Sequence, residues 1–205
     1  MDIVLNTYFN NPKLPVVPLP GFVDDFERPT ADTLGETLDG KAWTLHSYSN
    51  SSAVWGTYGD GTAGMKSSGA YFHLAVADAL VANGTLRATV GAIDETAENN
   101  RAGLAVRATD ANNYISIAAI DPTRDRLAIQ KRIDGSVSNV ATAEQALAPG
   151  DQLAVNLRGS SVEVILNGAT ILSAAIPEFT DVSTHGFYAF TGSAITWDHV
   201  EFVTD

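Results

Sequence analysis

The sequence predicts an all-β protein, a sandwich of two antiparallel sheets preceded by an extended N-terminal arm. From residue 42 onward, short runs of alternating apolar and polar residues follow one another at regular spacing, as strands of a sandwich or barrel do. Asp-Gly and Asn-Gly pairs separate several runs, and they supply the positive φ angles that hairpin turns need. No long segment has the apolar period of a helix, which argues against an α/β fold.

The alternation inside the runs gives each expected strand one buried face. In Tyr114–Ile120 and Leu153–Leu157, large apolar residues recur at every second position. Such a period is explained by burial against a facing sheet. The expected strands are Ala53–Tyr58, Ala70–Val76, Thr85–Ile93, Ala102–Ala108, Tyr114–Ile120, Arg126–Ile133, Gln152–Leu157, Val162–Leu166, Thr170–Ile176, Thr184–Phe190 and Ile195–Phe202.

Residues 1–21 predict a proline-rich arm, and residues 22–205 predict one sandwich domain. Closely spaced prolines remove backbone donors and favour extended conformations. The apolar side chains of the arm need a surface that covers them, and they are Tyr8, Phe9, Leu14, Val16, Val17 and Leu19. Two alternatives stay open: the arm folds back along its own domain, or it docks onto a neighbouring subunit or another structural protein.

Composition excludes several function classes. Asp and Glu number 24 against 12 Lys and Arg, which gives a formal net charge of -12. Because this field repels phosphate backbones, we expect no nucleic-acid partner. Cysteine is absent, which excludes disulfides and thiolate metal sites. The N-terminus lacks the features of a signal peptide, and no apolar run has the length of a membrane helix, so we expect neither export by that route nor membrane insertion.

The segment Phe22–Trp43 resembles the opening of a concanavalin-like jelly-roll domain of the kind found in minor tail proteins of bacteriophages. The elements that carry the resemblance are Asp25-Phe26, Arg28, Leu34-Gly35, Gly40 and Trp43. Trp197–Phe202 is similar to the closing strand of this group, which returns beside the first strand. The resemblance covers about residues 22 to 203. Within the opening segment, we expect Arg28 to order the first loop by bonding a local carboxylate such as Asp24 or Asp32.

Known catalytic patterns are missing from the sequence. Glycoside hydrolases of this group carry Glu-x-Asp-x-Glu on one strand, which places all three carboxylates on one face. That triplet does not occur here, and Asp25-x-Glu27 is only a partial match. Gly-x-Ser-x-Gly and His-Glu-x-x-His are also absent. We therefore expect the protein not to be an enzyme.

Calcium is the one cofactor that the sequence leaves open, and otherwise we expect none. Asp110, Asn112 and Asn113 form one oxygen-rich loop, while Asp121 and Asp125 bracket another. Calcium takes about six to eight oxygen ligands, and neither loop supplies them alone. Asp and Asn in these loops are explained as well by Asx-turns.

Aromatic residues give the candidate carbohydrate-binding surface. Trp55 and Tyr58 lie in the glycine-rich stretch Trp55–Gly64, which predicts an exposed ledge, and Tyr114 with Asn113 gives a second ring beside a polar group. The alternative is that these rings pack into the sandwich or into an interface.

The resemblance implies a non-enzymatic virion structural protein, either a minor tail protein or a capsid decoration protein. It implies other virion proteins as partners, assembly as a homo-oligomer, contact with host cell-surface glycans and a location on the virion. Two alternatives remain, a free carbohydrate-binding module and a glycan-active enzyme.

Overall fold

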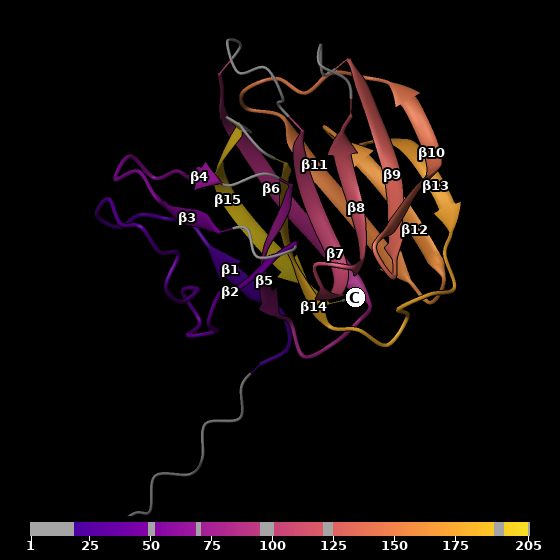
Figure 1. Ribbon diagram of the computed structural model, residues 1–205, viewed down its shortest axis with the longest axis horizontal. Coiled ribbons are helices and arrows are strands. Elements are labelled where there is room, and N and C mark those ends of the chain that lie inside the picture. Colours follow the sequence, from indigo (N-terminus) through magenta and orange to yellow (C-terminus); the bar gives the residue numbers. More distant parts are fainter. Residues whose placement is uncertain are drawn as a thin grey trace, which may run out of the picture.

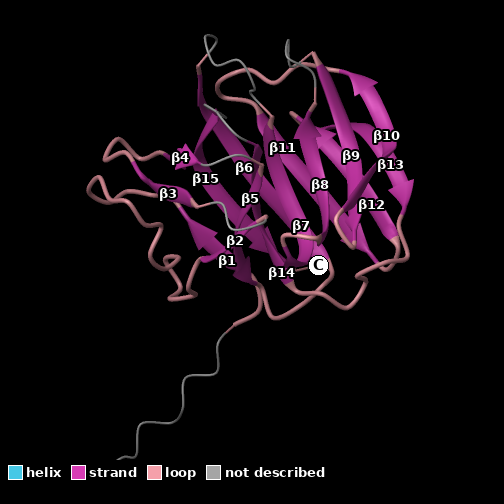
Figure 2. Cartoon of the chain, in the orientation of Figure 1, coloured by secondary structure: helices cyan, strands magenta, loops and turns pink. Residues whose placement is uncertain are grey.

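The computed structural model describes residues 19–48, 52–68, 71–94, 101–120, 125–190 and 195–204, which form a sandwich of two antiparallel sheets (Figures 1 and 2). In the described residues, the eight-stranded sheet has the spatial order β13 (Ala169–Ala175), β12 (Ser161–Leu166), β11 (Gln152–Arg158), β6 (Gly84–Ile93), β15 (Ile195–Val203), β4 (Ala63–Ser68) and β3 (Ala53–Thr57), with β1 (Phe22–Asp24) also on β15. The seven-stranded sheet has the order β10 (Ser136–Glu144), β9 (Arg126–Ile133), β8 (Asn113–Ala119), β7 (Ala102–Asp110), β14 (Thr184–Phe190), β5 (Phe72–Asp78) and β2 (Thr44–Ser47). This part of the chain contains no helix that is long and apolar enough to span a membrane.

Hairpins between consecutive strands build one side of both sheets. β7 to β10 follow one another in the seven-stranded sheet, and β11 to β13 do the same in the eight-stranded sheet. Asp134 and Gly135 have φ of 48° and 83°, and Asn167 and Gly168 have φ of 50° and 83°. Two successive positive φ angles are the requirement of a type I′ turn, so these two pairs fix the register of their hairpins as predicted.

The closing strand β15 joins the two ends of the chain. Along most of its length it pairs with β6, and its last residues also pair with β1, so that Phe22 lies opposite Phe202. On the edge away from β6, its first residues pair with β4. The expectation that the last strand returns beside the first is therefore confirmed.

A stack of aromatic rings ties the two sheets together in the core. The Phe187 ring of β14 lies 6.2 Å from Trp55 of β3 and 5.3 Å from Trp197 of β15, at interplanar angles of 16° and 21°. Trp43, just before β2, stacks on Phe187 at 5.5 Å. Because these rings come from both sheets, their contacts fix the packing of one sheet on the other.

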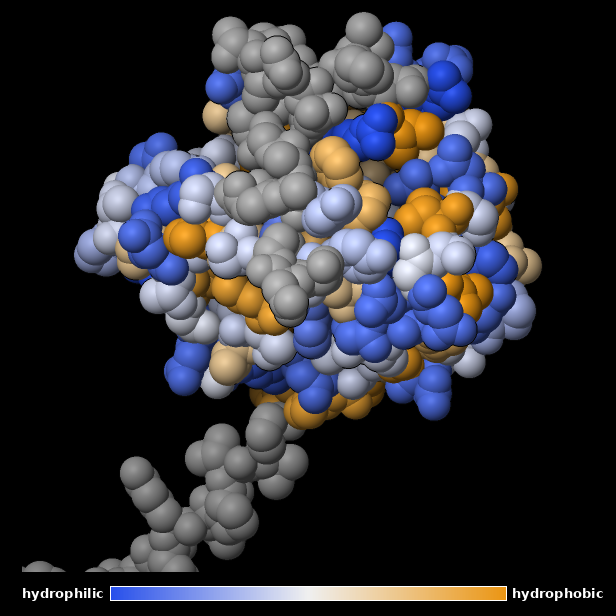
Figure 3. Space-filling model, in the orientation of Figure 1, coloured by the Kyte–Doolittle hydropathy of each residue, from blue (hydrophilic) through white to orange (hydrophobic). Residues whose placement is uncertain are grey.

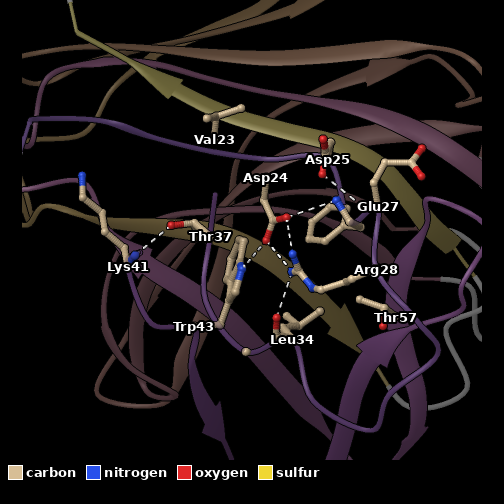
Figure 4. Close-up of polar contacts among 12 residues, drawn as sticks. Val23, Asp24, Asp25, Glu27, Arg28, Leu34, Thr37, Lys41, Trp43 and Thr57 are labelled. Atoms are coloured by element: carbon tan, nitrogen blue, oxygen red, sulfur yellow. Dashed lines mark hydrogen bonds and ion pairs between the residues drawn. The ribbon is translucent and has the colours of Figure 1, made fainter. Parts of the chain in front are cut away.

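The opening loop is held by a buried carboxylate (Figure 4). Asp24 is fully buried and accepts two hydrogen bonds from the guanidinium of Arg28, at 2.8 and 2.7 Å. Trp43 Nε1 donates to the same carboxylate at 2.8 Å, and Arg28 also donates to the carbonyl of Leu34 at 2.8 Å. The expectation that Arg28 orders this loop through Asp24 is confirmed, whereas Asp32 pairs with Lys66 instead.

All eleven expected strands are present with ends within two residues of the prediction, but β1, β2, β4 and β10 were not expected. In the described residues, the first strand, β1, begins at Phe22. Of the predicted docking residues, Tyr8, Phe9, Leu14, Val16 and Val17 lie outside the described residues. Leu19 is exposed, and its carbonyl accepts a hydrogen bond from Lys41 Nζ at 2.8 Å.

Candidate functional site

The seven-stranded sheet carries a second hydrophobic cluster on its outer face. Ile115 and Ile117 of β8 belong to the core between the sheets, whereas Tyr114 and Ala118 belong to this second cluster. The buried residues of β5, β7 and β14 are likewise distributed between the core and the second cluster, as expected from the alternation of side chains along a strand. Both faces of this sheet are therefore covered by apolar side chains.

Small residues at the centre of the outer face leave room for large rings. β7, which lies between β8 and β14, contributes Gly103 and Ala105. Above them the rings of Tyr114 and Tyr188 approach to 6.0 Å between centroids, and Phe72 of β5 stacks on Tyr188 at 6.0 Å. Side chains from strands that are not neighbours thus meet over the middle of the sheet.

Two arginines lie against these rings. The guanidinium carbon of Arg132 is 4.4 Å from the centroid of the Tyr48 ring and 4.5 Å from that of Phe72, and Arg101 lies 5.4 Å from that of Phe190. These distances are those of cation–π contacts. We name this group the aromatic–arginine cluster, and its members are Tyr48, Tyr71, Phe72, Tyr114, Tyr188, Phe190, Arg101 and Arg132.

One end of the cluster reaches the surface. Tyr71 is 49% exposed, and it packs edge-on against Tyr48 at 5.6 Å. Tyr71 also has a φ of 90°, which a residue with a Cβ rarely adopts. Backbone strain of this kind persists only where the surrounding structure enforces it, and it concentrates at binding sites. Tyr48, Phe72 and Phe190 are half-buried, so the end of the cluster offers ring faces, whereas Arg132, which contacts the Tyr48 and Phe72 rings, is buried.

Burial keeps the inner tyrosines of the cluster protonated. It raises the pKa of Tyr114 to about 12, although the neighbouring Arg132 acts in the opposite direction. It also raises the pKa of Tyr188 well above its usual value. Both hydroxyls therefore remain neutral hydrogen-bonding groups over the physiological pH range.

A polar hollow of about 480 Å³ adjoins the cluster on the same face of the sheet. Val76 and Ala108, which belong to the second hydrophobic cluster, line it together with His46 and Asp78. The Asp78 carboxylate accepts from Ser183 Oγ at 2.7 Å, and burial lowers the pKa of His46 while Asp110 opposes the shift. The outer face thus combines exposed rings with a pocket of hydrogen-bonding groups.

The structure separates the residues that the sequence predicted as one carbohydrate-binding surface. Tyr114 belongs to the aromatic–arginine cluster, and the preceding Asn113 has a structural role in the next turn: its Nδ2 donates to Asp110 at 3.2 Å and its Oδ1 accepts from the amide of Asp134 at 3.0 Å. Trp55 is only 1% exposed and stacks in the core, so its placement on an exposed ledge was wrong.

Trp55–Gly64 forms part of the β3–β4 hairpin. The alternation of side chains along β3 directs the Trp55 indole into the core between the sheets. Tyr58 lies at the turn of this hairpin, 38% exposed, with Lys66 Nζ 5.3 Å from the ring centroid. It therefore belongs to the eight-stranded sheet and lies apart from the aromatic–arginine cluster.

In the first loop suggested for calcium, the carboxylate oxygens of Asp110 accept local hydrogen bonds. Asp110 accepts from the amide of Asn112 at 2.6 Å and from the side chain of Asn113, which is an Asx-turn. Asp121 lies outside the described residues, and within them no group of three or more His, Asp or Glu side chains has the arrangement of a metal site. Asp125, which is among the described residues, therefore belongs to no such group.

Sequence reasoning missed most of the cluster. Tyr48 and Phe190 lie at strand ends, and Arg132 lies on a strand whose sequence gives no sign of what faces it. Their convergence depends on the order of strands in the sheet, which only the structure reveals. The one usable signal is the recurrence of aromatic residues at the start of β5 and the end of β14, which are paired strands.

Solved structures share this architecture at very low sequence identity. The beta-glucanase of Bacillus licheniformis aligns with a TM-score of 0.58 and 10% identity, covering 91% of this chain and 99% of that chain. A prokaryotic beta-1,3-1,4-glucanase (lichenase) derived from a mouse hindgut metagenome aligns with a TM-score of 0.56 and 9% identity, covering 91% and 100%. The chain is a concanavalin-like jelly roll. No protein-family model and no curated protein sequence matches it.

The expectation that this jelly roll is not an enzyme is overturned by the same matches. LamAcat from Zobellia galactanivorans also aligns, with a TM-score of 0.56 and 8% identity over 91% of this chain and 98% of that chain. Because glucanases have this fold, the fold is compatible with enzyme activity. The missing Glu-x-Asp-x-Glu triplet excludes only one arrangement of catalytic groups, and that was too narrow a basis for the conclusion.

Proposed function

We propose that this jelly roll binds glycans at the exposed end of the aromatic–arginine cluster. The observation that carries the proposal is the pair of tyrosine rings, Tyr48 and Tyr71, beside the Arg132 guanidinium on the outer face of the seven-stranded sheet. A ring face offers an apolar platform to the C–H groups of a sugar, and the Arg132 guanidinium, in a residue only 3% exposed, contacts the Tyr48 ring and holds it in place. The polar hollow next to the cluster would bind further hydroxyl groups.

The fold supports the same chemistry. Beta-glucanases of similar structure act on glucans, as their names state, so this architecture is able to present a sugar-binding face. The other large hollow, about 650 Å³ on the outer face of the eight-stranded sheet, is lined by polar and aliphatic side chains and by the imidazole of His199, with no Phe, Tyr or Trp among the residues that line it. We therefore assign the glycan to the seven-stranded sheet.

Calorimetric titration with a panel of soluble β-glucans and bacterial cell-wall oligosaccharides tests the proposal. Tyr71→Ala removes an exposed ring, and we expect it to weaken binding about tenfold, which is about 1.4 kcal/mol. Tyr58→Ala is the matched control, because it removes an exposed tyrosine from the other sheet. A panel without any binder, or equal loss of affinity in both variants, would contradict the assignment. Release of reducing ends from the same glycans measures hydrolysis in parallel.

From the sequence resemblance we further propose that this domain is displayed on a bacteriophage virion and attached by its N-terminal arm. Mass spectrometry of purified particles would find the protein in many copies beside tail or capsid proteins. Deletion of residues 1–20 would leave the sandwich folded and abolish its incorporation. Incorporation of the deleted protein at the normal level would show that the arm is not the attachment element.

A further inference from the structure

One lateral side of the sandwich ends in two long strands that lie together. β10 is the last strand of the seven-stranded sheet, and β13 is the last strand of the eight-stranded sheet. The two strands are in contact across the sandwich, and Figure 1 shows them next to each other at the right of the view. In the described part of the chain, each pairs on one side only. Both sheets therefore present free backbone groups along the same side.

β10 carries little of the charge by which proteins commonly protect an edge strand. It is nine residues long, and Glu144 at its end is its only charged residue. Edge strands are commonly protected by lysine, by proline, by a β-bulge or by being very short. Of these features, β10 has a bulge at Val140, where its register against β9 shifts between Asn139 and Ala141, but it has no lysine and no proline. Instead, β10 carries two exposed valines, Val137, which is 44% exposed, and Val140. Figure 3 shows hydrophobic surface among the polar residues in this region.

β13 repeats the pattern in the other layer. Its seven residues, Ala169–Ala175, contain no charge and no proline. Ile171 and Ala174 of β13, like Ala141 and Ala143 of β10, are partly buried against the core between the sheets. Apolar side chains of the core thus reach the surface along this side, between the two edge strands.

The opposite side of the sandwich is closed. β2 has only four residues. β3 is covered by the opening loop, because Ala31 and Thr57 exchange two backbone hydrogen bonds of 3.1 Å. A methyl group on Gly56 would collide with the carbonyl of Ala31, so the loop lies directly against this strand. The contrast between the two sides shows that the open edge is not a general property of this sandwich.

We propose that β10 pairs in antiparallel fashion with β10 of a second copy of this chain. Two antiparallel strands are related by a two-fold axis, so one strand is able to pair with its own copy in a closed dimer. Full overlap of Ser136–Glu144 with itself places Val140, the middle residue and the position of the bulge in the β10–β9 ladder, opposite its counterpart. The chain carries a net charge of -12, and like charges on two paired strands repel each other. Because β10 has only one charged residue, this repulsion is small between two β10 strands.

Light scattering coupled to size exclusion measures the predicted assembly directly. The expected mass is twice the 21.6 kDa of one chain. Val137→Lys combined with Val140→Lys places two positive charges in each strand, and it should yield monomers with an unchanged circular dichroism spectrum. Leu45→Lys, at an equally exposed aliphatic residue of β2, is the matched control and should remain dimeric. A monomeric wild-type protein, or an open-ended series of larger species, would overturn the proposal.

Disulfide trapping tests the register without depending on a destabilising charge. The chain has no cysteine, so a single introduced thiol can pair only with the same thiol of another copy. Residues opposite each other in antiparallel strands have Cα atoms about 5 Å apart, which is within the range of a disulfide. Val140→Cys should therefore form a covalent dimer under mild oxidation, and Leu45→Cys should not. Equal trapping of both variants, or trapping of neither, would refute the β10 pairing.

Discussion

His185 should make the folded protein sensitive to acid. The ring is fully buried and stacks on Phe202, with centroids 4.3 Å apart. Its Nδ1 accepts a hydrogen bond from the amide of Arg107 at 3.2 Å, and its Nε2 lies 3.4 Å from the carbonyl of Val81. The neutral ring with its proton on Nε2 satisfies both contacts. Protonation of Nδ1 would remove the acceptor and leave a cation without solvent near the Arg107 guanidinium.

The size of the effect follows from the pKa of His185. Burial, with a smaller contribution from Arg107, lowers this pKa from 6.5 to about 3. Because the folded pKa lies below the unfolded one, the stabilisation is complete above about pH 6.5 and is lost as the pH falls toward 3. A difference of about 3.5 pKa units corresponds to about 5 kcal/mol over the whole range and about 3 kcal/mol by pH 4. That loss is comparable to the total stability of many domains.

Urea unfolding followed by tryptophan fluorescence between pH 7 and pH 4 measures this loss. His185→Gln should be less stable than the wild type at pH 7, and the difference in the free energy of unfolding should shrink by about 3 kcal/mol at pH 4. Carboxyl groups such as Asp39, whose pKa is lowered by its bonds to Thr37 and Lys41 despite partial desolvation, titrate in both proteins and cancel. A difference that stays constant with pH, or a His185 resonance that titrates near 6.5 in the folded protein, would refute the reasoning.

Three further predictions concern stability. Asp24→Asn weakens the buried pair with Arg28 and should cost about 3 kcal/mol of unfolding free energy, seen as a lower thermal midpoint; an unchanged midpoint would contradict a structural role. Gly56→Ala should destabilise the opening loop, because its Cβ would lie 2.0 Å from the carbonyl oxygen of Ala31, and increased protease sensitivity of that loop would report it. Tyr114 has a raised folded pKa of about 12, so its stabilisation is present below pH 10 and is lost toward pH 12. Tyr114→Phe should flatten the decline of stability in this alkaline range, and an unaltered decline would exclude Tyr114 as its source.

The strands that the sequence revealed are those with one face in the core. β9 and β14 have the predicted bounds, because one face of each packs against the core between the sheets and the alternation of side chains is legible. β10 was invisible for the opposite reason. Most of its side chains are exposed. The segment Ser-Val-Ser-Asn-Val-Ala-Thr-Ala-Glu therefore lacks the regular alternation of large apolar and polar residues that marks a strand with one buried face. β4 was read as part of a glycine-rich ledge, since Ala63 and Gly64 give no strand signal.

The candidate site was harder to predict than the fold. Tyr114 and Trp55 were selected on the same grounds, and both are buried, Tyr114 in the second hydrophobic cluster and Trp55 in the core between the sheets. The composition of a segment does not say which way a ring points, because that depends on register against strands that are distant in sequence. Arg132 of β9 meets Tyr48 and Phe72, which come from strands on the other side of β7, so no local sequence pattern predicts the contact.

Antiparallel pairing of two β10 strands would strengthen the binding of this protein to a polysaccharide. A two-fold axis perpendicular to the seven-stranded sheet keeps the outer faces of both copies on the same side, so a paired molecule presents two aromatic–arginine clusters toward one surface. On a polymer with repeated sugar units, the second cluster then binds at a high effective concentration, and weak individual contacts combine into lasting attachment. The open edge would thus set the avidity of the protein for a polysaccharide independently of the chemistry in either site.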